Sequence, residues 1–180
     1  MVVGRDEGRT PPVVVGVDGS HGSTQALSWG LREALHRQAP LRVVTVWAWG
    51  CSTGPGTTGA VRDAASMARQ ARQTQEALVR AVLARLPGVP PELTTELVQG
   101  DPASALIERS RDGDLLVLGS QGVSAAAHLV GSVADTCLRH GACPVVVVPA
   151  GSTRGSGDQR PPSEPRSGLA PAVLGALGLL

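Results

Sequence analysis

The sequence predicts an α/β fold: a three-layer αβα structure around a five-stranded parallel sheet in strand order 3-2-1-4-5. Apolar runs too short for a helix alternate along the chain with segments in which apolar residues recur at helical spacing. This alternation is typical of a parallel sheet with helices on both faces, and right-handed crossovers restrict the topology further. Glycine-rich turns follow the first and fourth apolar runs. We therefore expect a topological switch point between strands 1 and 4, where such sheets bind ligands.

The first half of the chain supplies two strands and two helices. Residues 13–17 form an apolar strand that ends in an Asp-Gly-Ser turn, and apolar spacing then predicts a helix that ends near Gln38. The next strand spans residues 41–47, and the glycine-rich residues 50–59 form a loop by composition. A longer helix is expected over about residues 61–86, because a Pro-Gly pair follows it.

The second half begins with residues 93–98, whose weak alternation and Thr and Glu side chains favour an edge strand. Asp101 and Pro102 are typical of the N-cap and the first residue of a short helix. Residues 115–118 and residues 145–148 are apolar runs that predict two buried strands. The fourth and fifth strands therefore enclose the last glycine-rich loop and helix.

That last helix is expected to begin at Ser132. Ser132 and Asp135 match a capping box, in which the serine is the N-cap. Apolar spacing predicts one buried face for the helix, and Gly141 ends it. The face comprises Val133, Ala134, Cys137 and Leu138.

Composition excludes several function classes. The chain has 180 residues and a net charge of +1, which argues against general binding to nucleic acid or membrane surfaces. All 16 basic residues are arginines. A P-loop lysine and a Schiff-base lysine are therefore both impossible.

The cysteines and the termini favour a cytoplasmic protein. Three cysteines without an apolar leader suggest free thiols in a reducing compartment. Cys137, His140 and Cys143 have a metal-like spacing, but Cys137 falls on the expected buried face, so no metal site is predicted. Residues 169–180 are apolar but shorter than the ~20 residues that span a bilayer.

Composition also divides the chain into three parts. Residues 1–11 are expected to be a flexible leader, and residues 12–150 the folded domain. Residues 151–180 begin with a stretch rich in Gly, Pro, Ser and charge, and are expected to be a disordered, low-complexity tail.

A candidate site follows from the predicted topology. Asp18 ends the first strand and Gly119 ends the fourth, so both face the switch point although they lie far apart in sequence. Glycine turns and a helix start beside a strand end leave backbone N–H groups suited to phosphate. The sequence therefore predicts an anion-binding crevice there.

These segments resemble the universal stress protein family. VVVGVDGS is similar to the family's first strand and acidic turn, and QALSWGLREA to its first helix. GSQG, then GS, then CPVVVVP resembles its nucleotide motif and last strand. The match covers roughly Val13 to Pro149. The resemblance implies a Rossmann-like fold similar to the adenine nucleotide alpha hydrolases, and a stress-response regulator that binds ATP, or AMP or ADP, with Mg²⁺ as a possible companion of the nucleotide.

The resemblance also implies site residues. The acidic residue that contacts the nucleoside corresponds to Asp18, with Gly16 and Gly19 beside it, and the valine against adenine corresponds to Val46. The residues that would hold ribose and phosphates are Gly119, Ser120, Gly122, Gly131 and Ser132. Catalytic residues are not predicted, although slow ATP hydrolysis occurs in the family.

One departure from the family pattern keeps other functions open. Eight residues, Val123 to Val130, separate Gly122 from Gly131 where the family has nine, and none is Arg or Lys. The alternatives are a member that no longer binds nucleotide and acts through protein contacts, and a weak ATPase. The apolar fifth strand, residues 145–148, is expected at the sheet edge, where it would pair with a second copy as in many family members.

Overall fold

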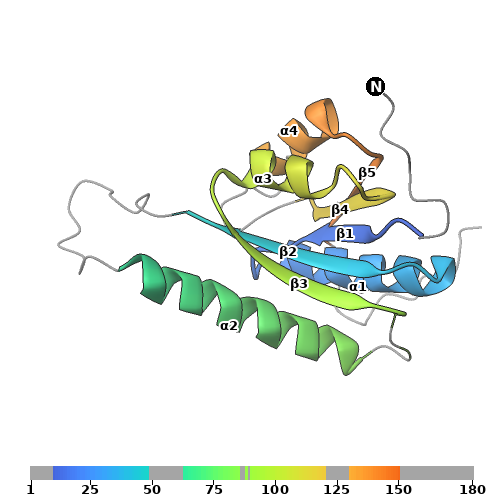
Figure 1. Cartoon of the computed structure of the whole chain (residues 1–180), viewed down its shortest axis with the longest axis horizontal. Helices are drawn as coiled ribbons and strands as arrows, with labels where there is room; N and C mark the ends of the chain where they lie inside the picture. The colour runs from blue at the N-terminus through green and yellow to red at the C-terminus, as the bar shows by residue number, and fades with distance from the viewer. Residues whose placement is uncertain (1–9, 49–62, 86–87, 89, 121–129, 151–180) are drawn as a thin grey trace, which may run out of the picture.

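The computed structural model describes residues 10–48, 63–85, 88, 90–120 and 130–150. The described residues form five strands and four helices that alternate along the chain (Figure 1). The strands are β1 (Val13–Gly16), β2 (Leu41–Trp47), β3 (Leu93–Gln99), β4 (Leu115–Gly119) and β5 (Val145–Val148). The helices are α1 (His21–Arg37), α2 (Ala64–Leu83), α3 (Pro102–Arg109) and α4 (Ser132–His140).

The sheet confirms the predicted topology. Its strands are all parallel and lie in the order β3-β2-β1-β4-β5. In the register of the central strands, Val13 of β1 pairs with Leu41 of β2 and with Leu115 of β4. The order reverses direction between β1 and β4, so the switch point is where the sequence predicts it.

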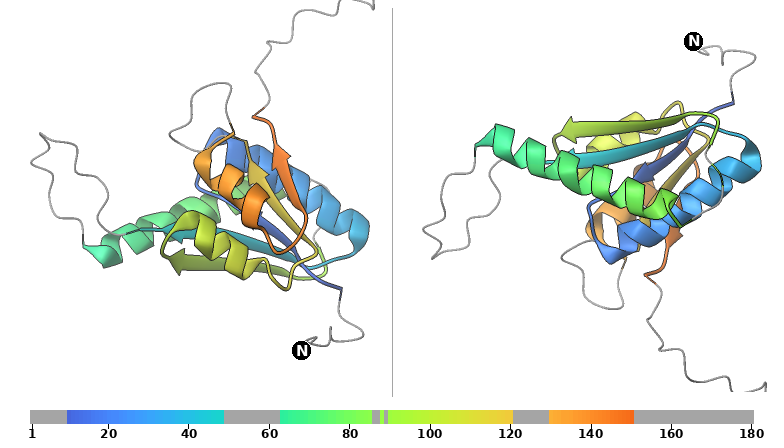
Figure 2. Two further views of the ribbon diagram at one scale, coloured as in Figure 1. Left: turned by 90° about the horizontal axis from the view of Figure 1, so that it is seen from above. Right: turned by 90° about the horizontal axis from the view of Figure 1, so that it is seen from below.

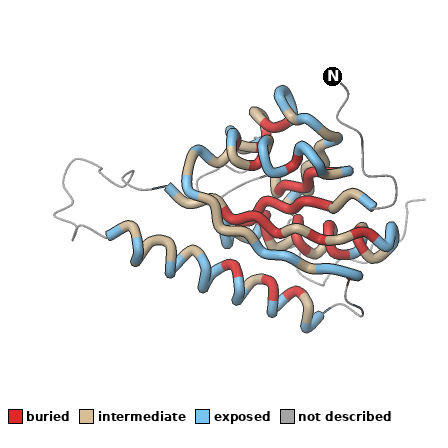
Figure 3. The backbone as a smooth tube through the Cα atoms, viewed as in Figure 1, coloured by how far each residue is buried: buried red, intermediate tan, exposed pale blue. Residues whose placement is uncertain are grey.

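Two apolar cores lie on opposite faces of the sheet, because successive side chains of a strand point to opposite faces. Val13 and Val15 pack with α1 and α2 in the first core. Val14 packs with α3 and α4 in the second core, which includes Leu106 and Cys137. Figure 2 shows the two helix pairs on opposite faces, and Figure 3 shows the burial concentrated in the central strands and the inner side of α1.

The helix ends follow local hydrogen bonding. Ser20 caps α1, because its hydroxyl accepts a hydrogen bond from the Ser23 N–H at 3.1 Å. Asp101 is the N-cap of α3 and Pro102 its first residue, which confirms that prediction. Helix α2 begins later than predicted, at Ala64, because Asp63 has extended backbone and its carboxylate accepts from the N–H of Ser66.

Helix α4 begins at Ser132 as predicted, but the predicted capping box is wrong. Gly131 is the N-cap, with extended backbone at φ −61° and ψ 151°, and Ser132 is the first helical residue. The cap therefore has no side chain to bond the first turn. Leu138 also departs from prediction, since it is 49% exposed, whereas Ala134 and Cys137 are buried. The helix is short, and its buried residues Ala134 and Cys137, three positions apart, are the ones that face the sheet.

The two edge strands differ in character. The side chains of β3 are exposed or half-buried, which suits its predicted place at an edge. All four valines of β5 are half-buried at the other edge. The predicted tail and most of the predicted leader lie outside the described residues. Within the described part of the chain, each helix is too short or too polar to cross a membrane.

Candidate functional site

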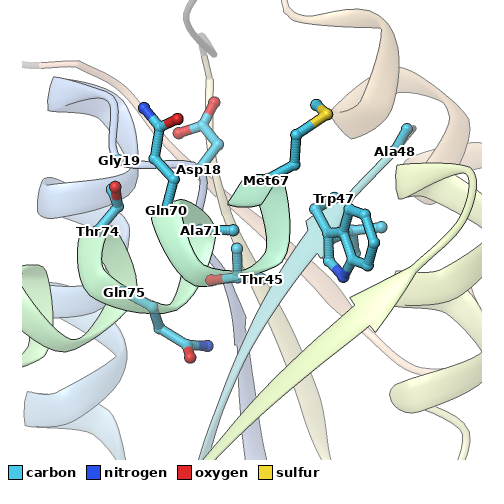
Figure 4. Close-up of a pocket in the computed structure, with 11 residues that line it drawn as sticks. Asp18, Gly19, Thr45, Trp47, Ala48, Met67, Gln70, Ala71, Thr74 and Gln75 are labelled. Atoms are coloured by element: carbon cyan, nitrogen blue, oxygen red, sulfur yellow. The ribbon is translucent and has the colours of Figure 1, made fainter. Parts of the chain in front are cut away.

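A cavity of about 300 Å³ lies at the carboxyl ends of β1 and β2, under the first half of α2 (Figure 4). Its volume is at the lower end of the range of about 300–1,000 Å³ that is usual for small-molecule sites. Its lining comprises Asp18, Gly19, Thr45, Val46, Trp47, Ala48, Met67, Gln70, Ala71, Thr74 and Gln75. The cavity therefore adjoins the predicted switch point on the side of α1 and α2.

The rim of the cavity is the turn after β1. Asp18 is exposed there, and its Oδ1 accepts a hydrogen bond from the Ser20 N–H at 2.9 Å. Gly19 has a φ of +83°, and a Cβ at this position would lie 2.5 Å from Thr74 Cγ2 of α2. Glycine at position 19 is thus required both by the left-handed backbone and by the close approach of α2.

Thr45 of β2 lies deep in the same cavity. Its side chain is only 6% exposed, and its Oγ1 is fully buried with no hydrogen-bond partner in the described part of the chain. Buried hydroxyls in folded proteins are almost always paired, because an unmade bond costs about 1–3 kcal/mol. Thr45 is therefore the lining residue whose buried hydroxyl the described part of the chain leaves unpaired.

Gln75 of α2 fixes the helix to the sheet beside Thr45. It is 3% exposed, and its Nε2 donates to the carbonyl oxygens of Val43 at 3.1 Å and Glu96 at 2.8 Å. Both acceptors are carbonyls, so the amide orientation follows from the contacts. These bonds join β2, β3 and α2 at the inner end of the cavity.

The walls are mainly apolar and include one aromatic ring. Thr45 and Trp47 lie two residues apart on β2 and so share one face of the strand. Met67 and Ala71 of α2 line the same cavity. Val46, the valine predicted to lie against adenine, also lines the cavity, and its partly buried side chain packs against the second core. Among the described residues, the lining holds no arginine and no histidine. Such a cavity suits a flat, uncharged ring better than a phosphate.

The ends of β4 and α4 form the neighbouring half of the crevice, and here packing accounts for Gly119. A Cβ at Gly119 would lie 2.6 Å from the carbonyl carbon of Gly22 and 2.8 Å from its oxygen. The end of β4 thus touches the first turn of α1 directly. Gly119 is required for this contact whatever else it binds.

Ser120 connects three elements. Its N–H donates to Val148 O at 2.8 Å, and its carbonyl oxygen accepts from Gly131 N at 2.8 Å. Its hydroxyl accepts from the N–H of Ala150 at 3.1 Å. Ser120 therefore holds the end of β5 and the start of α4 beside β4.

The structure separates the predicted site residues into groups. Asp18, Gly19 and Val46 belong to the cavity lining. Gly119, Ser120, Gly131 and Ser132 lie together at the β4–α4 half, outside that lining. Gly16 is buried in the second core, where a Cβ would lie 2.6 Å from Leu118 Cδ2. Gly122 and most of the shortened loop lie outside the described residues.

Sequence reasoning included Val46 of β2 but missed Thr45 and Trp47 of the same strand and every lining residue of α2. Strand alternation from Val43 would have placed Thr45 and Trp47 on the face that α2 covers. Helical spacing back from Val79 would have placed Gln75 and Ala71 on the buried side of α2. Thr45 and Gln75 are polar, so the spacing of apolar residues alone does not indicate that they are buried.

The two cysteines in the described part of the chain, Cys137 and Cys143, lie outside the cavity lining. Cys137 is fully buried under α4, and burial raises the pKa of its thiol to about 11. Burial also raises the pKa of Cys143. A search of the described residues for three or more His, Cys, Asp or Glu side chains able to hold one metal ion finds none.

Comparisons with known proteins agree on one family. The family model described as the universal stress protein family matches residues 10–149. Universal stress protein Rv2624c from Mycobacterium tuberculosis is 34% identical over 146 residues, which are 81% of this chain and 50% of that protein. The chain thus spans about half the length of these curated relatives.

Solved structures show the same fold. The universal stress protein UspA from Lactobacillus plantarum aligns with a TM-score of 0.59 at 22% identity, over 78% of this chain and 98% of that one. A universal stress protein solved in complex with cAMP aligns with a TM-score of 0.51 at 25% identity, over 79% of this chain and 99% of that one.

Proposed function

The chain belongs to the universal stress protein family, and on that premise we propose that it binds an adenine nucleotide and acts as a stress-response regulator. The ligand would be ATP, or AMP or ADP. One observation carries the proposal: the cavity beside Asp18 has apolar walls and a buried hydroxyl that lacks a partner in the described part of the chain. The relative solved with cAMP supports an adenine ligand for this fold.

The cavity and the neighbouring strand ends would hold different parts of the nucleotide. The ring would enter between Trp47 and the side of α2, with the ribose near the Asp18 carboxylate. The phosphates would extend toward Gly119 and the start of α4. Helix α4 has no side-chain cap, so its first N–H groups suit an anion. Mg²⁺ would accompany ATP through phosphate oxygens, as is usual for this ion.

Filling the cavity tests the proposal. In Ala71→Phe a ring would project into the cavity from α2, and we expect at least a tenfold loss of affinity for ATP and AMP in calorimetry. Ala77→Phe is the matched control, because Ala77 is exposed on the same helix outside the lining. The control should bind like wild type. Including GTP shows whether the site prefers adenine.

Two results would favour the alternatives. If wild-type protein gives no heat with any nucleotide and releases none on denaturation, the protein-contact function replaces nucleotide binding. If phosphate release from ATP exceeds a no-protein control and is lost in Ala71→Phe, the weak ATPase is supported. Cytoplasmic location remains part of the proposal, and cell fractionation tests it.

We also propose that two copies pair through β5. The strand lies at the edge of the sheet, and its four valines are half-buried. An apolar edge strand without charges is a ready surface for pairing, which would satisfy its backbone groups. Val147→Lys should shift the protein toward monomer in light scattering. A wild type that is already monomeric at micromolar concentration would refute the pairing.

A further inference from the structure

We propose that the hydroxyl of Thr45 is the recognition group for the ring edge of the ligand, and that rotation of this side chain brings the hydroxyl, which is buried beside the cavity, into hydrogen bonding with the ring. This inference rests on the proposed function and assigns a base-contacting role to a residue outside the predicted site. It starts from a fully buried, unpaired polar atom in a residue that lines the cavity.

Thr45 is an exception among the buried polar residues of the described chain. The buried polar side chains are Ser23, Thr45, Gln75 and Ser110. Ser23 and Ser110 bond to backbone carbonyls of their own helical segments, at 2.9 Å and 3.1 Å. Gln75 bonds to two carbonyls of the sheet. The Thr45 hydroxyl alone is left without a partner in the described structure.

The surroundings of Thr45 explain why the fold does not supply that partner. Thr45 is in a strand, so its hydroxyl does not have the carbonyl four residues earlier that helical Ser and Thr use. Gln75, its polar neighbour in the lining, already donates from Nε2 to the carbonyl oxygens of Val43 and Glu96. A valine would have nearly the same shape and would leave no unpaired atom, as Val43 and Val44 show in the same strand. The Thr45 hydroxyl therefore makes no hydrogen bond that would stabilise the described fold.

Position within the cavity indicates which part of a ligand meets this hydroxyl. Asp18 is exposed at the rim, whereas Thr45 is buried. A phosphate beside Thr45 would lose its hydration without gaining a cation, because the described lining has no arginine or histidine. The apolar surfaces of Trp47, Met67 and Ala71 fit a heterocycle. The ring edge is therefore the polar part of a nucleotide that reaches Thr45.

This assignment predicts opposite effects of Thr45→Val on stability and on binding. Without ligand, the variant should melt a few degrees higher than wild type, because it removes a buried unpaired group. With ligand, it should bind AMP about tenfold more weakly, because the hydrogen bond is lost. A purely structural role for Thr45 would not move the two quantities in opposite directions.

The experiment measures melting temperature and calorimetric Kd for wild type and three variants with AMP. Thr45→Val should show the opposite shifts, and Thr45→Ser, which keeps the hydroxyl, should bind within about threefold of wild type. Thr95→Val is the matched control, an exposed threonine of β3 outside the cavity, and should bind like wild type. Competition with free adenine should show the same tenfold loss in Thr45→Val as AMP does, because the contact is to the ring.

The outcomes separate this inference from the proposed function. Wild type that binds AMP and Thr45→Val that binds it equally well would overturn the role of Thr45 and leave nucleotide binding intact. A loss seen with AMP but not with adenine would overturn the contact to the ring. Wild type that binds neither would overturn both proposals. If Thr45→Val does not fold, a Thr45→Ser protein more than tenfold weaker than wild type overturns the inference.

Discussion

The two halves of the crevice differ in how fully the polar groups in them are hydrogen-bonded within the described part of the chain. In the β1–β2 half, Thr45 leaves a buried hydroxyl without a partner in the described structure, and apolar walls enclose space. In the β4–α4 half, Ser120 bonds to three backbone groups and Gly119 packs on Gly22. The β4–α4 half carries the glycine-rich motif, and there the motif residues Gly119 and Ser120 make packing contacts and hydrogen bonds within the fold.

This difference shows that glycines and serines in a binding motif can be required by the fold alone. Gly119 is needed for the contact between β4 and α1, so its presence is expected with or without a ligand. Thr45 has no such structural justification, so it is the stronger indication of a ligand. Variants of single residues in each half, measured for both stability and ligand binding, therefore test this difference between the two halves.

The largest effect is expected from Gly119→Ala. The added Cβ would meet backbone atoms of Gly22 at 2.6 Å and 2.8 Å, and backbone cannot rotate out of the way as a side chain can. We expect a loss of about 3 kcal/mol in the free energy of unfolding, measured with urea. Gly16→Ala should cost less, about 1–2 kcal/mol, because the ends of Leu118 and Leu106 can move. Equal losses would show that the backbone contact is not decisive.

Alkaline pH should weaken the core beneath the β4–α4 half. Burial raises the pKa of the Cys137 thiol from 9.0 to about 11. The unfolded chain therefore ionises this thiol at lower pH than the folded protein does. The stability from the neutral thiol is complete below about pH 9 and is lost as the pH rises through about 11, by roughly 2–3 kcal/mol.

Urea unfolding of wild type and Cys137→Ala at pH 7.5, 9 and 10.5 measures this loss. The variant is less stable at neutral pH because it leaves a small cavity, but it should lose less stability as the pH rises. Parallel curves for the two proteins would contradict a role for Cys137 ionisation.

In the β1–β2 half, Gln75→Leu should destabilise by about 2 kcal/mol. The substitution removes both hydrogen bonds from Nε2 to the sheet carbonyls while keeping the side-chain volume similar. Gln73→Leu is the control on the exposed side of α2 and should leave the free energy of unfolding within about 0.5 kcal/mol of wild type. A Gln75 variant as stable as its control would mean that the sheet does not depend on this attachment.

The smallest effect on stability is expected for Gly131→Ala. Its backbone angles are open to any residue, so alanine at this N-cap should cost only about 0.5 kcal/mol. If phosphates lie at the start of α4, the methyl group should weaken ATP severalfold and leave adenosine unchanged in calorimetry. An equal effect on both ligands, or none, would place the phosphates elsewhere.

The sequence was sufficient for the fold because the fold depends on local pattern. The limits of β2 and the Asp101 cap follow from apolar runs and turn residues and are confirmed. Crossover handedness restricts the possible strand orders, and the expected order is confirmed. The capping box at Ser132 failed because a Ser-x-x-Asp pattern does not say which residue has extended backbone, and here it is Gly131.

The candidate site was only partly predictable because it depends on contacts between distant segments. Asp18 and Gly19 follow from their place at the end of a strand, and both line the cavity. Thr45 becomes informative only when its neighbours are known to leave it unpaired. The role of Gly119 needs the position of Gly22, which local sequence does not provide.

The contact between Gly119 and Gly22 also bears on how such a chain can change over time. Ser20, two residues before Gly22, donates its N–H to Asp18, so the Asp18 carboxylate is positioned relative to the end of β4. The one-residue difference from the family pattern falls after that point, between Gly122 and Gly131. The contact therefore separates the Asp18 turn from the segment in which this chain is one residue shorter than the family pattern. We expect an insertion or deletion in that segment to leave the contact between Gly119 and Gly22, and with it the position of Asp18, unchanged.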